Sequence, residues 1–248
     1  MSGDGVIAAA ADLADVWLVG EDVPDPGLEL LYAVLDPAER HRADAAMTAP
    51  DRRRFVVAHA AVRHIVGRRL GVPAERLRWS IGPRGKPELR GTGEELRVNL
   101  SHSGGLCMVA VTDSRPVGVD IQSLVADATA TALGRRYFPA AEARLVQAAP
   151  SPVGGPAALF ARLWARKEAV VKAAGTRLAL GLAVPVHGAC PLTVEMDADG
   201  VPGSYRVTDV AAPQGYRAAV ALAGDEAFRV MFHEWSWSAV ALLPETGT

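Results

Sequence analysis

The chain has 248 residues, of which 50% are hydrophobic and 22% are charged, and its formal net charge is -2. This length allows one large domain or two smaller halves, and the ordinary composition with two cysteines excludes a collagen, a disordered chain and a disulfide scaffold. The weakly negative charge argues against a nucleic-acid partner, and the absence of an apolar run of about 18 residues argues against a membrane partner.

The first 116 residues predict a strand, a set of helices and then several strands. Residues 15–20 form a short apolar run that the prolines and glycine of 23–27 end. Two short helices are expected within 28–47, divided at Asp36 and Pro37. A longer helix is expected over Asp51–Leu70, with Asp51 as its N-cap and Gly71 as its stop. The strands expected after it cover 77–81, 96–100, 106–112 and 117–121.

The same order of elements returns in the second half. Helices are expected over 129–137, 140–149 and, after a loop rich in proline and glycine, over Ala157–Ala174. Strands are expected over 192–196, 205–210 and 216–223. Helices followed by antiparallel strands, twice, predict an α+β fold of two similar halves. We place these halves at residues 1–116 and 117–248, with the active site at the seam between them.

The strand Val-Gly-Val-Asp-Ile-Gln at 117–122 carries the first candidate site residues. Because side chains alternate along a strand, Asp120 and Gln122 share one face, whereas Val119 and Ile121 take the other. A carboxylate beside an amide oxygen suits a hard cation such as Mg²⁺. An aspartate at a strand end is also a common turn or cap residue, so the motif by itself leaves both interpretations open.

The expected helix over 157–174 carries the second candidate group. Four side chains at a spacing of four form one stripe along it: Phe160, Trp164, Glu168 and Lys172. Glu168 and Lys172 could form an ordinary surface ion pair. However, only three of the 26 basic residues are lysines, namely Lys86, Lys167 and Lys172. A lysine kept among so many arginines favours a chemical role for its ammonium group.

The strand end Val-Asn-Leu-Ser-His-Ser-Gly at 98–104 and the loop Arg-Gly-Lys-Pro at 84–87 are the remaining candidates. Ser101 and His102 could hold a phosphate, and Lys86 could add a positive charge. A serine hydrolase is disfavoured, because adjacent strand residues face opposite sides and the chain has no Gly-x-Ser-x-Gly turn. A histidine in a turn can equally be structural.

Taken together and in this order, the Arg-rich helix that contains Asp51–Phe55 and the segments at 84–87, 98–104, 117–122 and 163–175 resemble the 4'-phosphopantetheinyl transferases. The resemblance is to the surfactin-type branch with Trp and Lys-Glu-Ala in its last motif, and it spans roughly residues 36–223. It implies a monomer whose two similar halves, each with an antiparallel sheet, are related by a pseudo-twofold axis.

The resemblance also implies an activity. An enzyme of the holo-[acyl-carrier-protein] synthase type moves the phosphopantetheine arm of coenzyme A to a serine of an acyl or peptidyl carrier protein and releases adenosine 3',5'-bisphosphate. Such enzymes serve polyketide or nonribosomal peptide biosynthesis in the cytoplasm. A divalent cation, Mg²⁺ or Mn²⁺, and coenzyme A as the donor substrate are therefore expected.

The resemblance assigns roles to residues of this chain. Asp120, Gln122 and Glu168 would hold the metal, although Gln122 stands where many relatives have a second acid. Glu168 would also be the base for the carrier serine, and Lys172 would neutralise or protonate the leaving phosphate. The residues implied to bind coenzyme A are Arg42, Arg54, Lys86, Ser101, His102 and Lys167.

Two other functions compete with this one. A metal-dependent pyrophosphate or coenzyme A hydrolase would use water in place of the carrier serine, but no separate base for that water is evident in the sequence. A non-catalytic module that binds coenzyme A or a carrier protein would be favoured by loss of Glu168 or Lys172. Both residues are present, so Gln122 is the only support for the module.

Overall fold

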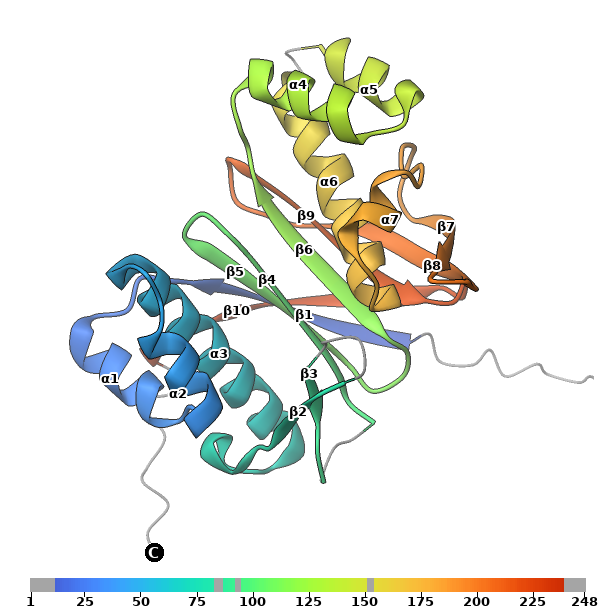
Figure 1. Cartoon of the computed structure of the whole chain (residues 1–248). Helices are drawn as coiled ribbons and strands as arrows, with labels where there is room; N and C mark the ends of the chain where they lie inside the picture. The colour runs from blue at the N-terminus through green and yellow to red at the C-terminus, as the bar shows by residue number, and fades with distance from the viewer. Residues whose placement is uncertain (1–11, 83–86, 92–94, 151–153, 239–248) are drawn as a thin grey trace, which may run out of the picture.

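The structure, a computed structural model, describes residues 12–82, 87–91, 95–150 and 154–238. Its first sheet has four strands in the order β10-β1-β5-β4, and helices α1 to α3 cover one face of it (Figure 1). The elements of this part are β1 (Asp12–Gly20), α1 (Asp25–Ala33), α2 (Pro37–Asp44), α3 (Ala49–Leu70), a short 3-10 helix (Ala74–Arg76), β4 (Arg97–Ser103) and β5 (Leu106–Thr112). A separate two-stranded ribbon pairs β2 (Trp79–Ile81) with β3 (Pro87–Leu89).

The second sheet is antiparallel throughout, in the order β6-β9-β8-β7, and the long helix α6 lies against it. The elements of this part are β6 (Val117–Ser123), α4 (Asp127–Tyr137), α5 (Ala140–Gln147), α6 (Gly155–Ala174), α7 (Leu178–Leu182), β7 (Leu192–Ala198), β8 (Val201–Val210) and β9 (Tyr216–Ala223). The α+β fold is therefore confirmed, with a second sheet that is antiparallel and a first sheet that is antiparallel over β1, β5 and β4.

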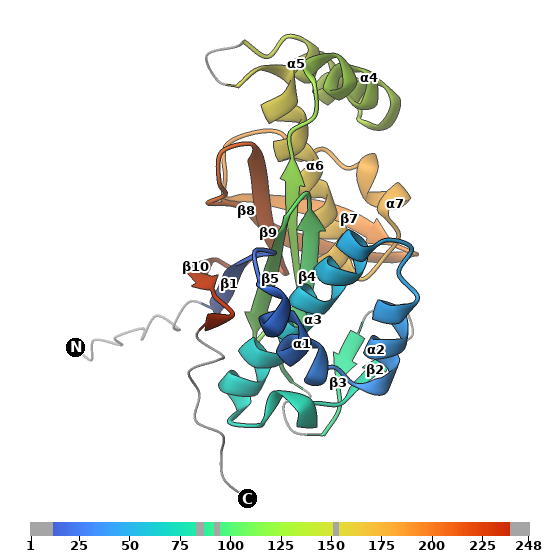
Figure 2. The ribbon, with the colours of Figure 1, turned by 90° about the vertical axis from the view of Figure 1, so that its left-hand side faces the viewer.

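The two sheets pack against each other through small and branched side chains. Ala14 and Val16 of β1 meet Val119 and Ile121 of β6 in a buried cluster between the sheets. The outer faces of the sheets pack against α3 and α6 in two further cores. Figures 1 and 2 show α1 to α3 at one end of the molecule and α4 and α5 at the other, with the long strands between them. The edge strands β4 and β6 thereby come together in the middle.

Strand β10 (Phe228–Trp235) is not expected from the sequence, yet it pairs in parallel with β1 at the edge of the first sheet. Half-buried and exposed side chains alternate over residues 228–231, and the alternation breaks at Phe232. Phe228 and Val230 pack against the core between the sheets. The partner strand of β10 lies at the other end of the chain. The first sheet thus includes a strand from beyond residue 116, and the division at 116/117 remains a prediction.

Helix ends follow the expected chemistry with one correction. The stops at Gly71 and Gly175 are confirmed, since both glycines are left-handed, with φ of 65° each. Helix α3 begins two residues earlier than expected, and its N-cap is Thr48, whose hydroxyl accepts a hydrogen bond from the Asp51 N–H at 3.2 Å. Asp51 is therefore a first-turn residue, where its charge favours the helix N-terminus.

Glycine at position 118 allows α6 to lie directly on β6. A Cβ atom placed there would stand 2.0 Å from the carbonyl oxygen of Ala169 and 2.4 Å from the amide nitrogen of Ala173. Backbone can approach this closely only where a side chain is missing. The contact brings the last turns of α6, which carry Glu168 and Lys172, beside the strand that carries Asp120. Among the described residues, no helix is long and apolar enough to cross a membrane.

Candidate active site

A cavity of about 300 Å³ lies where β4, β6 and α6 meet. The predicted alternation along β6 is confirmed, because Asp120 and Gln122 line this cavity while Val119 and Ile121 are buried in the core between the sheets, although Ile121 also borders the cavity. The residues around the cavity are Leu100, Ser101, His102, Asp120, Ile121, Gln122, Glu168 and Lys172. The expected stripe on α6 is also present, since Phe160 and Trp164 pack in the second core with ring centroids 5.5 Å apart.

The ammonium of Lys172 joins the two carboxylates of the cavity. Its Nζ lies 2.7 Å from Asp120 Oδ1 and 3.5 Å from Glu168 Oε2. It also donates hydrogen bonds to Ser101 Oγ at 3.0 Å and to the Val119 carbonyl at 3.3 Å. The sequence therefore predicts the Glu168–Lys172 pair correctly, whereas its partner Asp120 becomes visible only in the fold.

Asp120 is buried in the wall of the cavity, and its environment perturbs its carboxyl group. Its side chain is 6% exposed, and Ser101 donates a hydrogen bond to its Oδ1 at 2.6 Å. Burial raises the pKa of Asp120 to about 6; the charge of Lys172 opposes this shift and that of Glu168 adds to it. A carboxyl group with a shifted pKa beside a second acid and an amine in a cavity is a candidate for function.

The cavity fits a divalent cation held by two carboxylates. The second oxygen of Asp120, Oδ2, is buried and has no hydrogen-bond partner in the described part of the chain, and Glu168 faces the same ammonium. In the described ranges, no group of three or more His, Cys, Asp and Glu side chains is arranged so that it could hold a metal ion. Mg²⁺ does not require one, because it commonly takes one or two carboxylates and keeps water or phosphate elsewhere.

Gln122 lines the cavity on the same face as Asp120. Its Nε2 donates to the Ser123 carbonyl at 3.1 Å, so the amide is oriented by its own strand. A neutral amide oxygen is a weaker ligand for Mg²⁺ than a carboxylate. The structure brings Gln122 to the site, and its role as a ligand stays a prediction.

Two of the residues expected to bind coenzyme A, Ser101 and His102, come to the cavity from β4. Partial burial lowers the pKa of His102, and the positive charges of Arg54 and Lys172 lower it further. At neutral pH the His102 ring is therefore an uncharged hydrogen-bonding group. Ser101 is 5% exposed and its hydroxyl is occupied by Asp120 and Lys172, so it organises the acidic side of the cavity.

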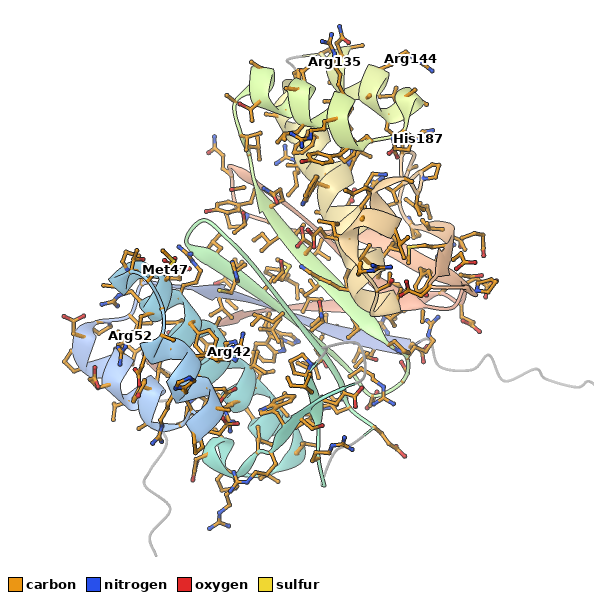
Figure 3. All side chains as sticks on the ribbon, viewed as in Figure 1. Arg42, Met47, Arg52, Arg135, Arg144 and His187 are labelled. Carbon is orange, nitrogen blue, oxygen red and sulfur yellow. The ribbon has the colours of Figure 1, made fainter. Side chains whose placement is uncertain are left out.

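The arginines expected from the first half lie outside the cavity lining. Arg54 of α3 is close enough to His102 to influence its pKa, and its Nε lies 2.8 Å from Glu21 Oε1. Arg42 of α2 is exposed, with its guanidinium 4.9 Å from the ring centre of Phe55. Figure 3 shows Arg42 among the helices of the first half. Their roles toward coenzyme A stay predictions.

The expectation that Lys167 binds coenzyme A is corrected by the structure. Its side chain is 0% exposed, and its Nζ lies 2.7 Å from Glu142 Oε2 of α5 and donates to the Val184 carbonyl. Successive helix residues point about 100° apart, so Lys167 cannot share the direction of Glu168. An ammonium buried against Glu142 is not available to the phosphates of a ligand. Lys86, the other predicted phosphate contact, lies outside the described residues.

The comparisons with known proteins agree with this geometry. Residues 116–221 match the model of the 4'-phosphopantetheinyl transferase superfamily. The chain is 33% identical over 171 residues to the 4'-phosphopantetheinyl transferase HetI of Nostoc sp.. The aligned residues cover 68% of this chain and 71% of the relative. This chain belongs to the 4'-phosphopantetheinyl transferase superfamily.

Other superfamily relatives give the same result. The 4'-phosphopantetheinyl transferase psf-1 of Bacillus pumilus is 31% identical over 186 residues, 75% of this chain and 74% of the relative. A more distant one, the L-aminoadipate-semialdehyde dehydrogenase-phosphopantetheinyl transferase of Xenopus laevis, is 25% identical over 65% of this chain and 56% of the relative. Phosphopantetheinyl transferases move the phosphopantetheine group of coenzyme A to carrier proteins, and the function expected from the sequence is thereby confirmed.

Proposed function

We propose that this chain transfers the 4'-phosphopantetheine group of coenzyme A to a serine of acyl or peptidyl carrier proteins through the Asp120, Glu168 and Lys172 cluster, and that it depends on Mg²⁺. The observation that carries the proposal is the buried, unpartnered Oδ2 of Asp120 in a cavity that also holds Glu168 and Lys172. This set combines a carboxylate oxygen that has no hydrogen-bond partner among the described residues, a second acid and a cation. Phosphoryl-type transfer requires positioning and charge neutralisation, and these groups supply both.

Each side chain has a defined task in the transfer. When bound to Asp120 and Glu168, Mg²⁺ would neutralise charge on the pyrophosphate of coenzyme A. Glu168 accepts the proton of the carrier serine as the serine oxygen bonds to the phosphorus next to pantetheine. The bond from that phosphorus to the bridging oxygen breaks, and adenosine 3',5'-bisphosphate leaves. Lys172 donates to the leaving phosphate, and its ammonium already lies between the two acids.

Measuring the release of adenosine 3',5'-bisphosphate separates the three candidate functions. We expect release by the wild-type chain only when coenzyme A, Mg²⁺ and an apo carrier protein are all present, and a loss of release in Glu168→Gln. Release without a carrier protein would identify a hydrolase. Binding of coenzyme A without any release, tested with several carrier proteins, would identify a non-catalytic binding module.

The matched control is Glu195→Gln, which makes the same chemical change on β7, where the acid accepts a hydrogen bond from Ser204 at 3.0 Å. This variant is expected to release adenosine 3',5'-bisphosphate at the wild-type rate. Equal losses in both variants would show that Glu168 has no specific part in the reaction.

The finer classification is also part of the proposal. We place the chain in the surfactin-type branch, as a cytoplasmic monomer of the holo-[acyl-carrier-protein] synthase type. Supporting this, the strand and helix that carry the acids and the strand that carries His102 all belong to one chain. A chain that contains both sides of its own site needs no second copy to complete it. Light scattering of the purified protein is expected to give the mass of a monomer, and a trimer would contradict this assignment.

A further inference from the structure

The junction between β4 and β6 is made by side chains. The two strands are edge strands of different sheets and lie next to each other (Figure 1). Three β4 side chains accept hydrogen bonds from backbone N–H groups on the edge of β6 that faces them. The pairs are Asn99 Oδ1 with Val119 N at 2.9 Å, Ser101 Oγ with Ile121 N at 3.4 Å, and Ser103 Oγ with Ser123 N at 2.9 Å.

Strand periodicity explains why one strand can supply all three acceptors. Asn99, Ser101 and Ser103 occupy alternate positions of β4, so their side chains point in one direction. The N–H groups of alternate β6 residues likewise point to one edge, because the intervening residues bond to β9. A buried edge N–H without an acceptor would be costly. The three side chains therefore satisfy the edge of β6 and fix its register against β4.

This register places the acid of the cavity. Val119 and Ile121 flank Asp120, and both are held from β4. The Val119 carbonyl also accepts a hydrogen bond from Lys172 Nζ at 3.3 Å. Ser101 completes the connection, since the hydroxyl that accepts from the Ile121 N–H donates to Asp120 Oδ1 at 2.6 Å. Lys172 belongs to α6, which packs on β6 and would move with it. A displacement of β6 along β4 would therefore separate both Asp120 and Lys172 from Ser101.

We propose that Asn99 and Ser103 are positioning residues, which hold β6 so that Asp120 and Lys172 meet Ser101 of β4 in the cavity. Neither side chain is among those that line the cavity in the described part of the chain, so each acts through β6. Ser103 also donates to Ser123 Oγ at 3.0 Å, which secures the end of the strand beyond Asp120. The inference rests on the proposed function for the metal role of Asp120.

The test uses two matched pairs of variants in the full chain. Asn99→Ala removes the acceptor of the Val119 N–H, whereas Asn99→Asp keeps an oxygen at the same place. Ser103→Ala removes a hydroxyl, whereas Ser103→Thr keeps it and suits a strand. Ser204→Ala is the control, because Ser204 is also a strand serine with one side-chain hydrogen bond, made to Glu195 at 3.0 Å.

Three measurements are made on each variant: amide hydrogen exchange by NMR, the dissociation constant for Mn²⁺ by electron paramagnetic resonance, and kcat and KM for transfer. We expect faster exchange of the Val119 amide in Asn99→Ala and of the Ser123 amide in Ser103→Ala. Removal of groups that orient a metal ligand typically lowers affinity or activity by about 10- to 100-fold. The Mn²⁺ affinity and kcat of both alanine variants should fall by about this factor, with a smaller change in KM for coenzyme A.

The conservative variants should recover most of the loss, and Ser204→Ala should match the wild type. Lower thermal stability of the alanine variants with unchanged Mn²⁺ affinity and kcat would overturn the inference, because the two residues would then have a structural role only. If the wild type binds Mn²⁺ but transfers nothing, the proposed function fails. Amide hydrogen exchange and Mn²⁺ affinity of the variants would then still show whether Asn99 and Ser103 position Asp120. If the wild type binds no Mn²⁺, the inference is overturned with the metal role on which it rests.

Discussion

Replacement of Asp120 by asparagine is expected to stabilise the metal-free protein while it abolishes transfer. Burial raises the pKa of Asp120 from 3.8 to about 6, even with Lys172 beside it. Because the folded-state pKa is above the unfolded value, ionisation of Asp120 weakens the fold as pH rises from about 4 to about 6. A difference of about 2 pKa units at 1.36 kcal/mol each gives about 3 kcal/mol at pH 8.

Asparagine avoids this loss, because it has nearly the same shape and does not ionise. Its Oδ1 can still accept the hydrogen bond that Ser101 donates to Asp120 Oδ1. The expected gain in stability already takes account of the attraction between Asp120 and Lys172, because the charge of Lys172 is one of the causes that set the pKa of Asp120. The variant should therefore unfold at a higher urea concentration than the wild type in EDTA at pH 8, by an amount that corresponds to about 1 to 3 kcal/mol.

The pH dependence provides the control. Below about pH 3 both side chains are largely uncharged in the folded and unfolded states, and the two proteins should have the same stability. Added Mg²⁺ should stabilise only the wild type, in proportion to the logarithm of its concentration above the dissociation constant. A variant less stable than the wild type in EDTA at pH 8 would refute the reasoning, because it would show that the ionised carboxylate strengthens the metal-free fold.

Three further substitutions test the contacts of α6 with the elements around it. Gly118→Ala places a methyl group 2.0 Å from the backbone of α6, so we expect a loss of about 1 to 3 kcal/mol in stability and slower transfer. Gly20→Ala is the control, because its methyl group meets open space; it should change neither stability nor transfer. Glu142→Gln leaves Lys167 buried without a counter-charge and should cost about 3 to 5 kcal/mol by urea unfolding; a loss below 1 kcal/mol would contradict the buried pair. Burial by itself raises the pKa of Asp209, but the hydrogen bonds and charges of Arg166 and Arg162 together outweigh this effect, so the pKa is lowered. The stability advantage of the wild type over Asp209→Asn should therefore be present above about pH 4 and disappear at lower pH. A stability difference that is independent of pH would contradict this.

Local patterns predict much of the fold and part of the site. The glycine stops of α3 and α6 follow from backbone chemistry at single positions, and the i, i+4 spacing predicts the pair of Glu168 and Lys172. Alternation along β6 predicts that Asp120 faces the site. These features depend on a few neighbouring residues, which explains why the sequence alone is sufficient.

Features that depend on distant partners are not predicted. The edge strand β10 is defined by its pairing with β1 from the opposite end of the chain. Lys167 adjoins Glu168 in sequence, but Glu142 on another helix determines its direction. The polar positions 99, 101 and 103 of β4 carry a recognisable alternation. Their acceptor role needs the edge of β6, which only the assembled sheets bring into contact.

The most direct test of the central claim is intact mass spectrometry of an apo carrier protein incubated with this chain, coenzyme A and Mg²⁺. The account predicts that the carrier gains the mass of one phosphopantetheine group on its serine, and that the gain is lost with Glu168→Gln or with EDTA. An unchanged carrier mass, obtained with several acyl and peptidyl carrier proteins and a chain that binds coenzyme A, would contradict the account.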